Sequence, residues 1–369
     1  SARATDTPIA APVDPNPPAR RPSPAPPRRS AAWVPAAHRW HDVAMYDPTR
    51  PGPFYEDFRV GATLPPLPSV TLTDADNAMY RAVTGDQHAL AADAGRYRTV
   101  SGSGGALANP GIVMHYSIGQ TTMATRQAIA NLYYRSVRVV RPVELGQTLT
   151  TVTTVLGLKD SAPKGDQFRG KVWLGIVTSS EDGPVVEYER CALVRGNGPA
   201  QPGHDDDIPG PSDPSPLTDL VGGVPAWDLS SLPVSDWAVG ETKVDPLRDH
   251  VDLAAPFARL TFNQAAVHRD VTMTANGRRL VYGGHVQGLA QASLTRMLPG
   301  LATVQAWDGC DHVGPAYEGD LIEFGHTLVE SAQAGSGRLL RFETTGTPVG
   351  HDGTRGADIL RWTPIAWAP

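Results

Sequence analysis

The chain has 369 residues, of which 40% are hydrophobic and 19% are charged, and its formal net charge is −6. This length allows two domains of ordinary size, and no apolar run approaches the roughly 20 residues that span a bilayer. The acidic balance and the lack of a Lys/Arg-rich block argue against nucleic acid as a partner. Cys191 and Cys310 lie far apart and outside any metal-binding spacing, so we expect no zinc site, no disulfide framework and a reducing, cytoplasmic location.

Two segments of biased composition divide the chain. Residues 1–45 are rich in Pro, Ala and Arg and lack the apolar core of a signal peptide, so we expect a disordered head. Residues 198–227 are rich in Pro, Gly and Asp, a composition typical of a linker. The remaining ranges, 46–197 and 228–369, are predicted to be the two domains.

The two predicted domains carry four similar landmarks in the same order. The pairs are YEDFRVGATL (55–64) with SDWAVGETKV (235–244), VTGDQHALAAD (83–93) with LTFNQAAVHRD (260–270), NPGIVMHYSIGQ (109–120) with YGGHVQGLAQA (282–292), and RPVELGQTL (141–149) with GPAYEGDLI (314–322). The offset between partners drifts only from 179 to 173 residues. Single short matches arise by chance, but four in one order at nearly constant spacing indicate a tandem duplication.

Each copy is predicted to hold one central helix followed by strands. In the second copy we expect the helix from His285, after two glycines, with its end at Pro299 and Gly300. Alternating, β-branched runs predict antiparallel strands at 131–143, 147–158, 171–180, 185–194, 321–332, 337–348 and 357–368. A helix wrapped by a meander of long strands is an α+β fold.

These landmarks resemble the MaoC-like acyl dehydratases, a hotdog-fold family, in the two-repeat form that includes (R)-specific enoyl-CoA hydratases and mesaconyl-CoA hydratases. YEDFRVG is similar to the family's opening, TGDQHALAAD to its hydratase motif GDxNPxHxD, and RPVELGQTL and AYEGDLI to a recurrent strand entry. The resemblance runs from residue 51 to residue 368. It implies a double hotdog, in which a long helix is wrapped by a curved antiparallel sheet in each copy and the two copies pack as a pseudo-dimer.

The resemblance also implies where the chemistry lies. In the family, the Asp and His of the motif act on water and the acyl chain, beside a backbone amide at the helix start that holds the thioester oxygen. The first copy keeps the acid as Asp86 but has Ala91 at the histidine position, whereas the second keeps His268 and carries Asn263 in place of the acid. A branch of the family that includes mesaconyl-CoA hydratases resembles LTFNQAAVHRD in this asparagine. We therefore place the site in the second copy, with the first supplying structure and part of the acyl tunnel.

Each motif residue is assigned a role by its chemistry. An imidazole can shuttle a proton near neutral pH, whereas an amide can only donate and accept hydrogen bonds, so we predict His268 as acid/base and Asn263 as the residue that orients water or substrate. Gly284, at the helix start beside Gly283, is predicted to donate its amide to the thioester oxygen, with Gly283 contacting the substrate. The plainer alternatives are a half-buried core histidine and a tight glycine turn. Asp86 is expected to cap a turn or helix.

Four arginines and one adjacent Asp/His pair are further candidates for the site. The phosphates of coenzyme A call for cations, for which the candidates are Arg135, Arg138, Arg278 and Arg279. Asp311 and His312 are adjacent, but neighbours in a strand point to opposite faces, so we expect strand-end or substrate-channel residues rather than a catalytic pair.

The predicted function is the reversible addition of water to a 2-enoyl thioester, with branched or carboxylated acyl groups among the candidates and CoA or acyl carrier protein as the carrier. The reaction needs a base, a proton donor and donors for the enolate-like oxygen, but no metal or redox cofactor is expected. Two alternatives stay open: a non-catalytic acyl-CoA-binding protein, because neither copy has a complete Asp/His pair, and an acyl-CoA thioesterase. Pairing of the pseudo-dimer into a further homodimer is also open.

Overall fold

The computed structural model describes residues 51–198, 200–211, 214–274 and 276–369, all within one structural unit that spans Val43–Pro369. The head predicted for residues 1–45 lies outside the described residues.

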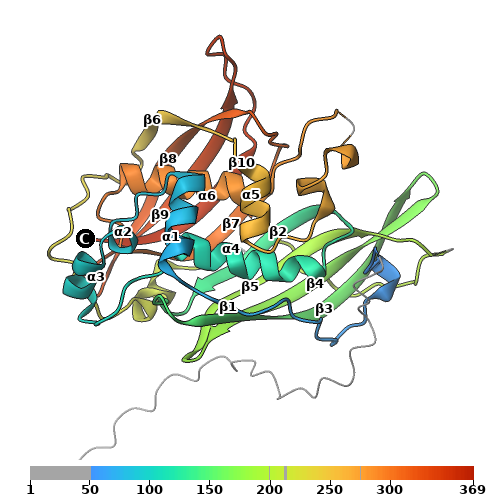
Figure 1. Cartoon of the computed structure of the whole chain (residues 1–369), viewed down its shortest axis with the longest axis horizontal. Helices are drawn as coiled ribbons and strands as arrows, with labels where there is room; N and C mark the ends of the chain where they lie inside the picture. Colours follow the sequence, from blue (N-terminus) through green and yellow to red (C-terminus); the bar gives the residue numbers. More distant parts are fainter. Residues whose placement is uncertain (1–50, 199, 212–213, 275) are drawn as a thin grey trace, which may run out of the picture. The chain divides into compact units, whose positions relative to one another are not determined.

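The described strands form one ten-stranded sheet in the order β1-β3-β4-β5-β2-β7-β10-β9-β8-β6 (Figure 1). Their bounds are β1 Val70–Thr71, β2 Ala128–Val139, β3 Thr148–Lys164, β4 Gln167–Ser180, β5 Gly183–Arg195, β6 Thr242–His250, β7 Thr303–Asp311, β8 Leu321–Ala334, β9 Gly337–Val349 and β10 Leu360–Ala368. From the outer edge of the sheet to its centre, the strands of the two halves correspond: β1-β3-β4-β5-β2 in the first half and β6-β8-β9-β10-β7 in the second. The halves join where β2 pairs antiparallel with β7, with Val137 opposite Trp307.

The strands follow the alternation of the sequence. In β4, for example, the side chains of Val172, Leu174 and Ile176 are buried while their neighbours are half-exposed, as expected for a strand with one face on a core. Each strand run predicted from the sequence overlaps a strand of the sheet. Three strands were not predicted from the sequence. The strand β1 has only two residues, and β6 is mostly exposed. The strand β7 is buried along nearly its whole length and therefore lacks alternation.

Six α-helices accompany the sheet in the described ranges. They are α1 Asp74–Thr84, α2 Ala89–Ala92, α3 Ala94–Ser101, α4 Pro110–Gln120, α5 Ala254–Leu260 and α6 Gly283–Met297. Figure 1 shows α4 and α6, the central helices of the two repeats, lying against the sheet. Nearly every residue of both helices is buried, as in a helix enclosed on all sides. In these ranges no helix combines the length and hydropathy that crossing a membrane requires.

The ends of the central helices follow from local sequence. The side-chain oxygen of Asn109 accepts a hydrogen bond of 2.8 Å from the Gly111 N–H, and Pro110 fills the first helical position, where its missing N–H costs nothing. The second helix was predicted from His285 and begins two residues earlier, at Gly283. It ends at Met297, just before Pro299.

The duplication inferred from the landmarks recurs in the backbone. Gly61 and Gly240, partners in the first landmark, have φ of 80° and 88°, and Gly146 and Gly319, partners in the fourth, both have φ of 95°. Positive φ is a conformation that glycine adopts without steric cost. The two repeats therefore share their turns as well as their strand order.

The predicted linker, residues 198–227, packs onto the sheet. It contains two short 3₁₀ helices, η4 (Leu217–Asp219) and η5 (Val221–Gly223), and its Leu217 and Trp227 are buried in a hydrophobic cluster with Trp367. Its composition predicted irregular backbone, which is what most of the described part of this segment shows, but not this packing. The domain boundaries at 46–197 and 228–369 stay a prediction.

Candidate active site

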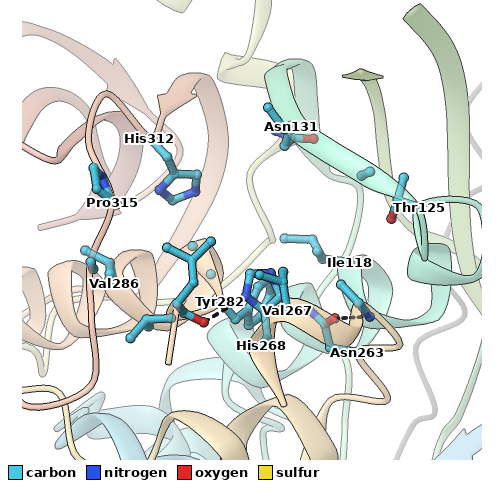
Figure 2. A pocket seen from close by; sticks show the side chains of 18 of the residues that line it. Ile118, Thr125, Asn131, Asn263, Val267, His268, Tyr282, Val286, His312 and Pro315 are labelled. Carbon is cyan, nitrogen blue, oxygen red and sulfur yellow. Dashed lines mark hydrogen bonds between the residues drawn. The ribbon is translucent and has the colours of Figure 1, made fainter. Parts of the chain in front are cut away.

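A cavity of about 430 Å³ lies between the two repeats (Figure 2). The first repeat contributes the end of α4 and residues of β2 and β5, and the second contributes the segment after α5, the start of α6 and the loop after β7. The cavity brings together the residues that the sequence singled out in the second repeat, namely Asn263, His268, Gly283 and Gly284.

His268 ends a 3₁₀ turn, η6 (Ala266–His268), and is half-buried. Its Nδ1 lies 3.1 Å from the carbonyl oxygen of Leu280. A carbonyl only accepts hydrogen bonds, so Nδ1 carries the proton and Nε2 keeps its lone pair. Burial lowers the pKa of His268 below its usual value, an effect that the hydrogen bond to Leu280 partly opposes. The imidazole is therefore neutral at pH 7 and suited to accept a proton.

Asn263 follows α5 and is only 1% exposed. Its Oδ1 accepts a hydrogen bond of 2.9 Å from the Ala265 N–H, which fixes the side chain in a local turn. Its Nδ2 has no acceptor among the described residues, although the side chain lines the cavity. The asparagine thus offers an N–H donor to whatever occupies the cavity.

The residue before Asn263 has an unusual backbone. Phe262 has φ of 59°, and at the matching place before Asp86 the first repeat has Gly85 with φ of 70°. Both repeats therefore make the same left-handed turn into the motif, but only the second makes it with a bulky side chain. This conformation costs a non-glycine residue about 1 kcal/mol, and such strain concentrates at functional sites.

The glycine pair at the start of α6 is required by two aromatic rings. A Cβ on Gly284 would lie 2.3 Å from the ring of Tyr282, and a Cβ on Gly283 would lie 2.4 Å from the imidazole of His312. The N–H of Gly284, in the first turn of the helix, has no intrahelical acceptor and lies at the positive end of the helix dipole. The sequence pointed to this amide, but it did not show that the two rings are the reason for the glycines.

The cavity wall contains residues that the sequence did not single out for the site. They are Asn131, Tyr134 and Arg190 from the first repeat and Tyr282 from the second. One signal was available, because in β5 the side chains of Tyr188, Arg190 and Ala192 share a face that is otherwise apolar and buried. A charged residue at an inward position of a strand is a candidate for function.

His312, expected at a strand end or in a channel, lies in the cavity wall just after β7. Burial, together with the nearby His268, lowers the pKa of His312 to about 4. A second neutral imidazole therefore stands beside the first, and Figure 2 shows both around the same space.

The four arginines proposed for coenzyme A do not line the cavity. Each has a protein partner: Arg135 with Glu189 at 3.3 Å, Arg138 with the Ser215 hydroxyl at 2.9 Å, Arg278 with Asp320 at 2.6 Å, and Arg279 with Glu318 at 3.0 Å. Their role in binding the phosphates stays a prediction, and their existing partners do not favour it.

Asp86, the acid of the first repeat, is buried and fully hydrogen-bonded. Its carboxylate accepts from the His88 N–H, Asn109 Nδ2, Gln291 Nε2 and Thr295 Oγ1, at 2.9 to 3.2 Å. The last two donors belong to α6 of the other repeat. The residue caps a turn, as expected, and it also ties the two repeats together.

No protein-family model matches the chain, but individual relatives do. The β-methylmalyl-CoA dehydratase of Chloroflexus aurantiacus is 32% identical over 74% of this chain and 81% of its own length. The mesaconyl-CoA hydratase of Cereibacter sphaeroides is 29% identical over 77% of this chain and 85% of its own.

Solved structures agree with these relatives. A MaoC domain dehydratase from Chloroflexus aurantiacus superposes with a TM-score of 0.79 at 27% identity, over 88% of this chain and 99% of that one. A Mycobacterium tuberculosis protein described as a double hotdog superposes with a TM-score of 0.76 at 33% identity, over 86% of this chain and 98% of that one. The predicted α+β double hotdog and the predicted hydratase or dehydratase class are confirmed, and the chain belongs to the MaoC-like acyl dehydratase family in its two-repeat form.

Proposed function

We propose that this enzyme adds water to, and removes it from, a 2-enoyl-CoA thioester in the cavity between its repeats. The observation that carries this proposal is the meeting, in one cavity, of a neutral imidazole with a free Nε2, an amide donor and a helix-start N–H. These are the base, the orienting group and the oxyanion donor that the reaction requires.

In the hydration direction, His268 Nε2 takes a proton from water as the water oxygen bonds to the β-carbon. The electron pair of the double bond moves toward the thioester oxygen, which the Gly284 N–H stabilises. The imidazolium then returns its proton to the α-carbon, which restores the neutral histidine. Asn263 Nδ2 donates a hydrogen bond that holds the water or the thioester in place. Because one residue takes and returns the proton, the addition is syn.

Two observations separate this reaction from its alternatives. Among the described residues that line the cavity there is no Asp or Glu, so the carboxylate that would drive thioester hydrolysis is not at hand. A purely binding protein would have no need of a free imidazole nitrogen in the cavity wall. Both relatives are named for turnover of CoA thioesters, which supports CoA rather than an acyl carrier protein as the carrier.

A substrate panel tests the proposal. The chain is incubated with crotonyl-, longer-chain 2-enoyl- and mesaconyl-CoA, while loss of the enoyl absorbance and release of free thiol are followed together. We expect loss of the enoyl absorbance on at least one substrate without thiol release. Thiol release would identify a thioesterase, and tight binding of every substrate without turnover would identify a binding protein.

A further inference from the structure

We propose that Arg190 binds a second, free carboxylate on the acyl group, so that the cavity selects thioesters of dicarboxylic acids. This inference rests on the proposed function, since it assigns the acyl group of that same reaction. It concerns a residue of the first repeat, the half without the catalytic histidine.

Arg190 is a buried cation without a counter-ion. Its side chain is 4% exposed, and its Nε and Nη1 donate to neutral acceptors, Asn131 Oδ1 at 3.1 Å and Thr121 Oγ1 at 2.8 Å. The guanidinium lies 5.7 Å from the centre of the Tyr134 ring. Among the described residues no carboxylate forms an ion pair with it, while the residue lines the cavity.

Two other arginines whose side chains are largely buried, Arg341 and Arg296, are arranged differently. Arg341 pairs with Asp308 at 2.8 Å and with Glu330, and Arg296 pairs with Asp245 and Asp249, each at 2.6 Å. A buried charge is costly unless an opposite charge and hydrogen bonds compensate it. Both of these arginines are compensated by carboxylates, whereas Arg190, which lines the cavity, has only neutral acceptors.

The guanidinium is positioned to receive an anion. An arginine has five N–H donors in a fixed fork that matches a carboxylate, and its bonds to Asn131 and Thr121 use only two of them. Asn131 and Thr121 hold the fork in place from the protein side. Figure 2 shows Asn131, which accepts from Arg190, around the same cavity as Asn263 and His268, so an acyl group in this cavity can reach both the arginine and the reacting groups.

A carboxylate fits this place better than a phosphate of coenzyme A. Arg190 lies in a wall with the buried Tyr134 and Ile118, where a singly charged planar group can be enclosed but a bulky dianion loses most of its hydration. The acyl groups in the names of the two relatives, mesaconyl and β-methylmalyl, both keep a free carboxylate after one end forms the thioester.

The second repeat lacks the feature. Arg190 pairs with Tyr134 across β5 and β2, and at the offset of 173 residues shared by the flanking landmarks Trp307 stands in the place of Tyr134. The residue paired with Trp307 is Pro364. The cation is therefore specific to the wall that faces His268, as a substrate-binding residue should be.

The test compares acyl groups with and without the second carboxylate. Succinyl-CoA and butyryl-CoA are saturated, so their binding is measured by calorimetry without turnover, and free CoA serves as the phosphate reference. The proteins are wild type, Arg190→Met, Arg190→Lys and Arg195→Met, the last being a half-buried arginine of the same strand that does not line the cavity.

We expect wild type to prefer succinyl-CoA, and Arg190→Met to weaken succinyl-CoA binding on the order of 100-fold while changing butyryl-CoA and free CoA by less than about threefold. Arg190→Lys keeps the positive charge but lacks the forked N–H donors of arginine, so we expect its affinity for succinyl-CoA to lie between those of wild type and Arg190→Met. Arg195→Met leaves the preference intact.

Equal binding of succinyl- and butyryl-CoA by wild type would overturn the inference whether or not Arg190→Met folds. A loss of free CoA binding in Arg190→Met would make Arg190 a phosphate ligand, and equal weakening of both acyl-CoAs would make it structural. Turnover separates the two proposals: a carboxylate preference without hydration of mesaconyl-CoA contradicts the hydratase alone, whereas hydration of 2-methylcrotonyl-CoA as fast as mesaconyl-CoA contradicts this inference alone.

Discussion

The two repeats use the same motif position in opposite ways. In the first, Asp86 accepts hydrogen bonds from four groups, two of them on the helix of the other repeat. In the second, Asn263 uses its oxygen in a local turn and keeps its Nδ2 for the cavity. A carboxylate whose lone pairs are occupied holds a structure together, whereas an unsatisfied amide can hold a ligand. In the proposed mechanism, one copy of the duplicated motif is structural and the other carries the chemistry.

The comparison extends to the backbone and to the cavity. The turn into the motif is made by Gly85 in the first repeat and by Phe262, at φ of 59°, in the second. The cavity is lined by His268 and Asn263 of the second repeat and by Arg190 of the first. The first repeat therefore contributes to the cavity, although none of its residues takes part in the proposed proton transfer.

The largest expected effect separates the histidines of the two repeats. His268→Ala removes the base, so we expect kcat to fall about 1000-fold on any substrate that wild type hydrates, measured by enoyl absorbance. His88→Ala is the control, since His88 is buried in the motif of the first repeat and accepts from the Ala91 N–H. It should lower stability and leave kcat within about threefold. Hydration by His268→Ala near the wild-type rate would move the chemistry elsewhere.

Replacing Asp86 should affect stability rather than turnover. Asp86→Ala leaves three buried donors without an acceptor, while the Thr295 hydroxyl keeps the Ala292 carbonyl, and we expect the free energy of unfolding to fall by about 3 kcal/mol. Urea denaturation measures this loss, and kcat per folded molecule should stay close to wild type. Asp86→Asn keeps one acceptor oxygen and should lose less. If Asp86→Ala instead abolished turnover at full stability, the first repeat would carry chemistry of its own.

Replacing Asn263 should affect turnover rather than stability. Asn263→Ala removes one preorganised donor, and we expect kcat to fall about 100-fold with little change in the free energy of unfolding. Near-normal kcat would show that His268 works with another partner.

The acid limb of the pH–rate profile tests whether His268 is the group whose protonation stops turnover. The proposed mechanism uses the neutral form of His268 in both directions, and burial lowers the pKa of His268, so we expect activity to persist below pH 6.5 and to fall only as pH drops through the lowered pKa. Asn263→Asp places a carboxylate beside the imidazole and should move this limb to higher pH, because the negative charge stabilises the imidazolium. An unmoved limb would show that His268 is not the titrating group.

The smallest expected effect concerns the central helices, each of which carries one buried histidine, His115 in α4 and His285 in α6. His115 in α4 lies against Gly288 of α6, the residue at its own repeat position. Burial and the nearby His285 lower the pKa of His115 to about 3. Since the folded pKa is below the unfolded value of 6.5, the unfolded state binds the proton first, and stability present above pH 6.5 is lost as pH falls.

From pH 7.5 to 5.0 one such histidine costs about 2 kcal/mol of unfolding free energy. His115→Leu should therefore lose about 2 kcal/mol less than wild type over this range, as measured by urea denaturation at the two pH values. An identical loss in both proteins would mean that His115 is protonated in the folded state.

The sequence alone determined the duplication, the strands of the meander and the residues of the second motif. Periodicity records which face of a strand meets the core, and the landmark glycines record turns with positive φ, as at Gly61 and Gly240. Both are local properties, so they can be read along the chain. The strand β7 was not predicted, because its burial along nearly the whole length removes the alternation of apolar and polar residues.

Only the tertiary structure decided what surrounds the motif. Arg190 and His312 reach the cavity through strand pairing and the packing of one repeat on the other, so no short window of sequence contains them together with His268. The same holds for Asp86, whose partners Gln291 and Thr295 lie about 200 residues away on α6. Local sequence carries backbone preference and burial, whereas hydrogen-bond partners and counter-ions are fixed by contacts between distant segments. That is why the sequence predicted the candidate motif, whereas the residues around it were identified only from the fold.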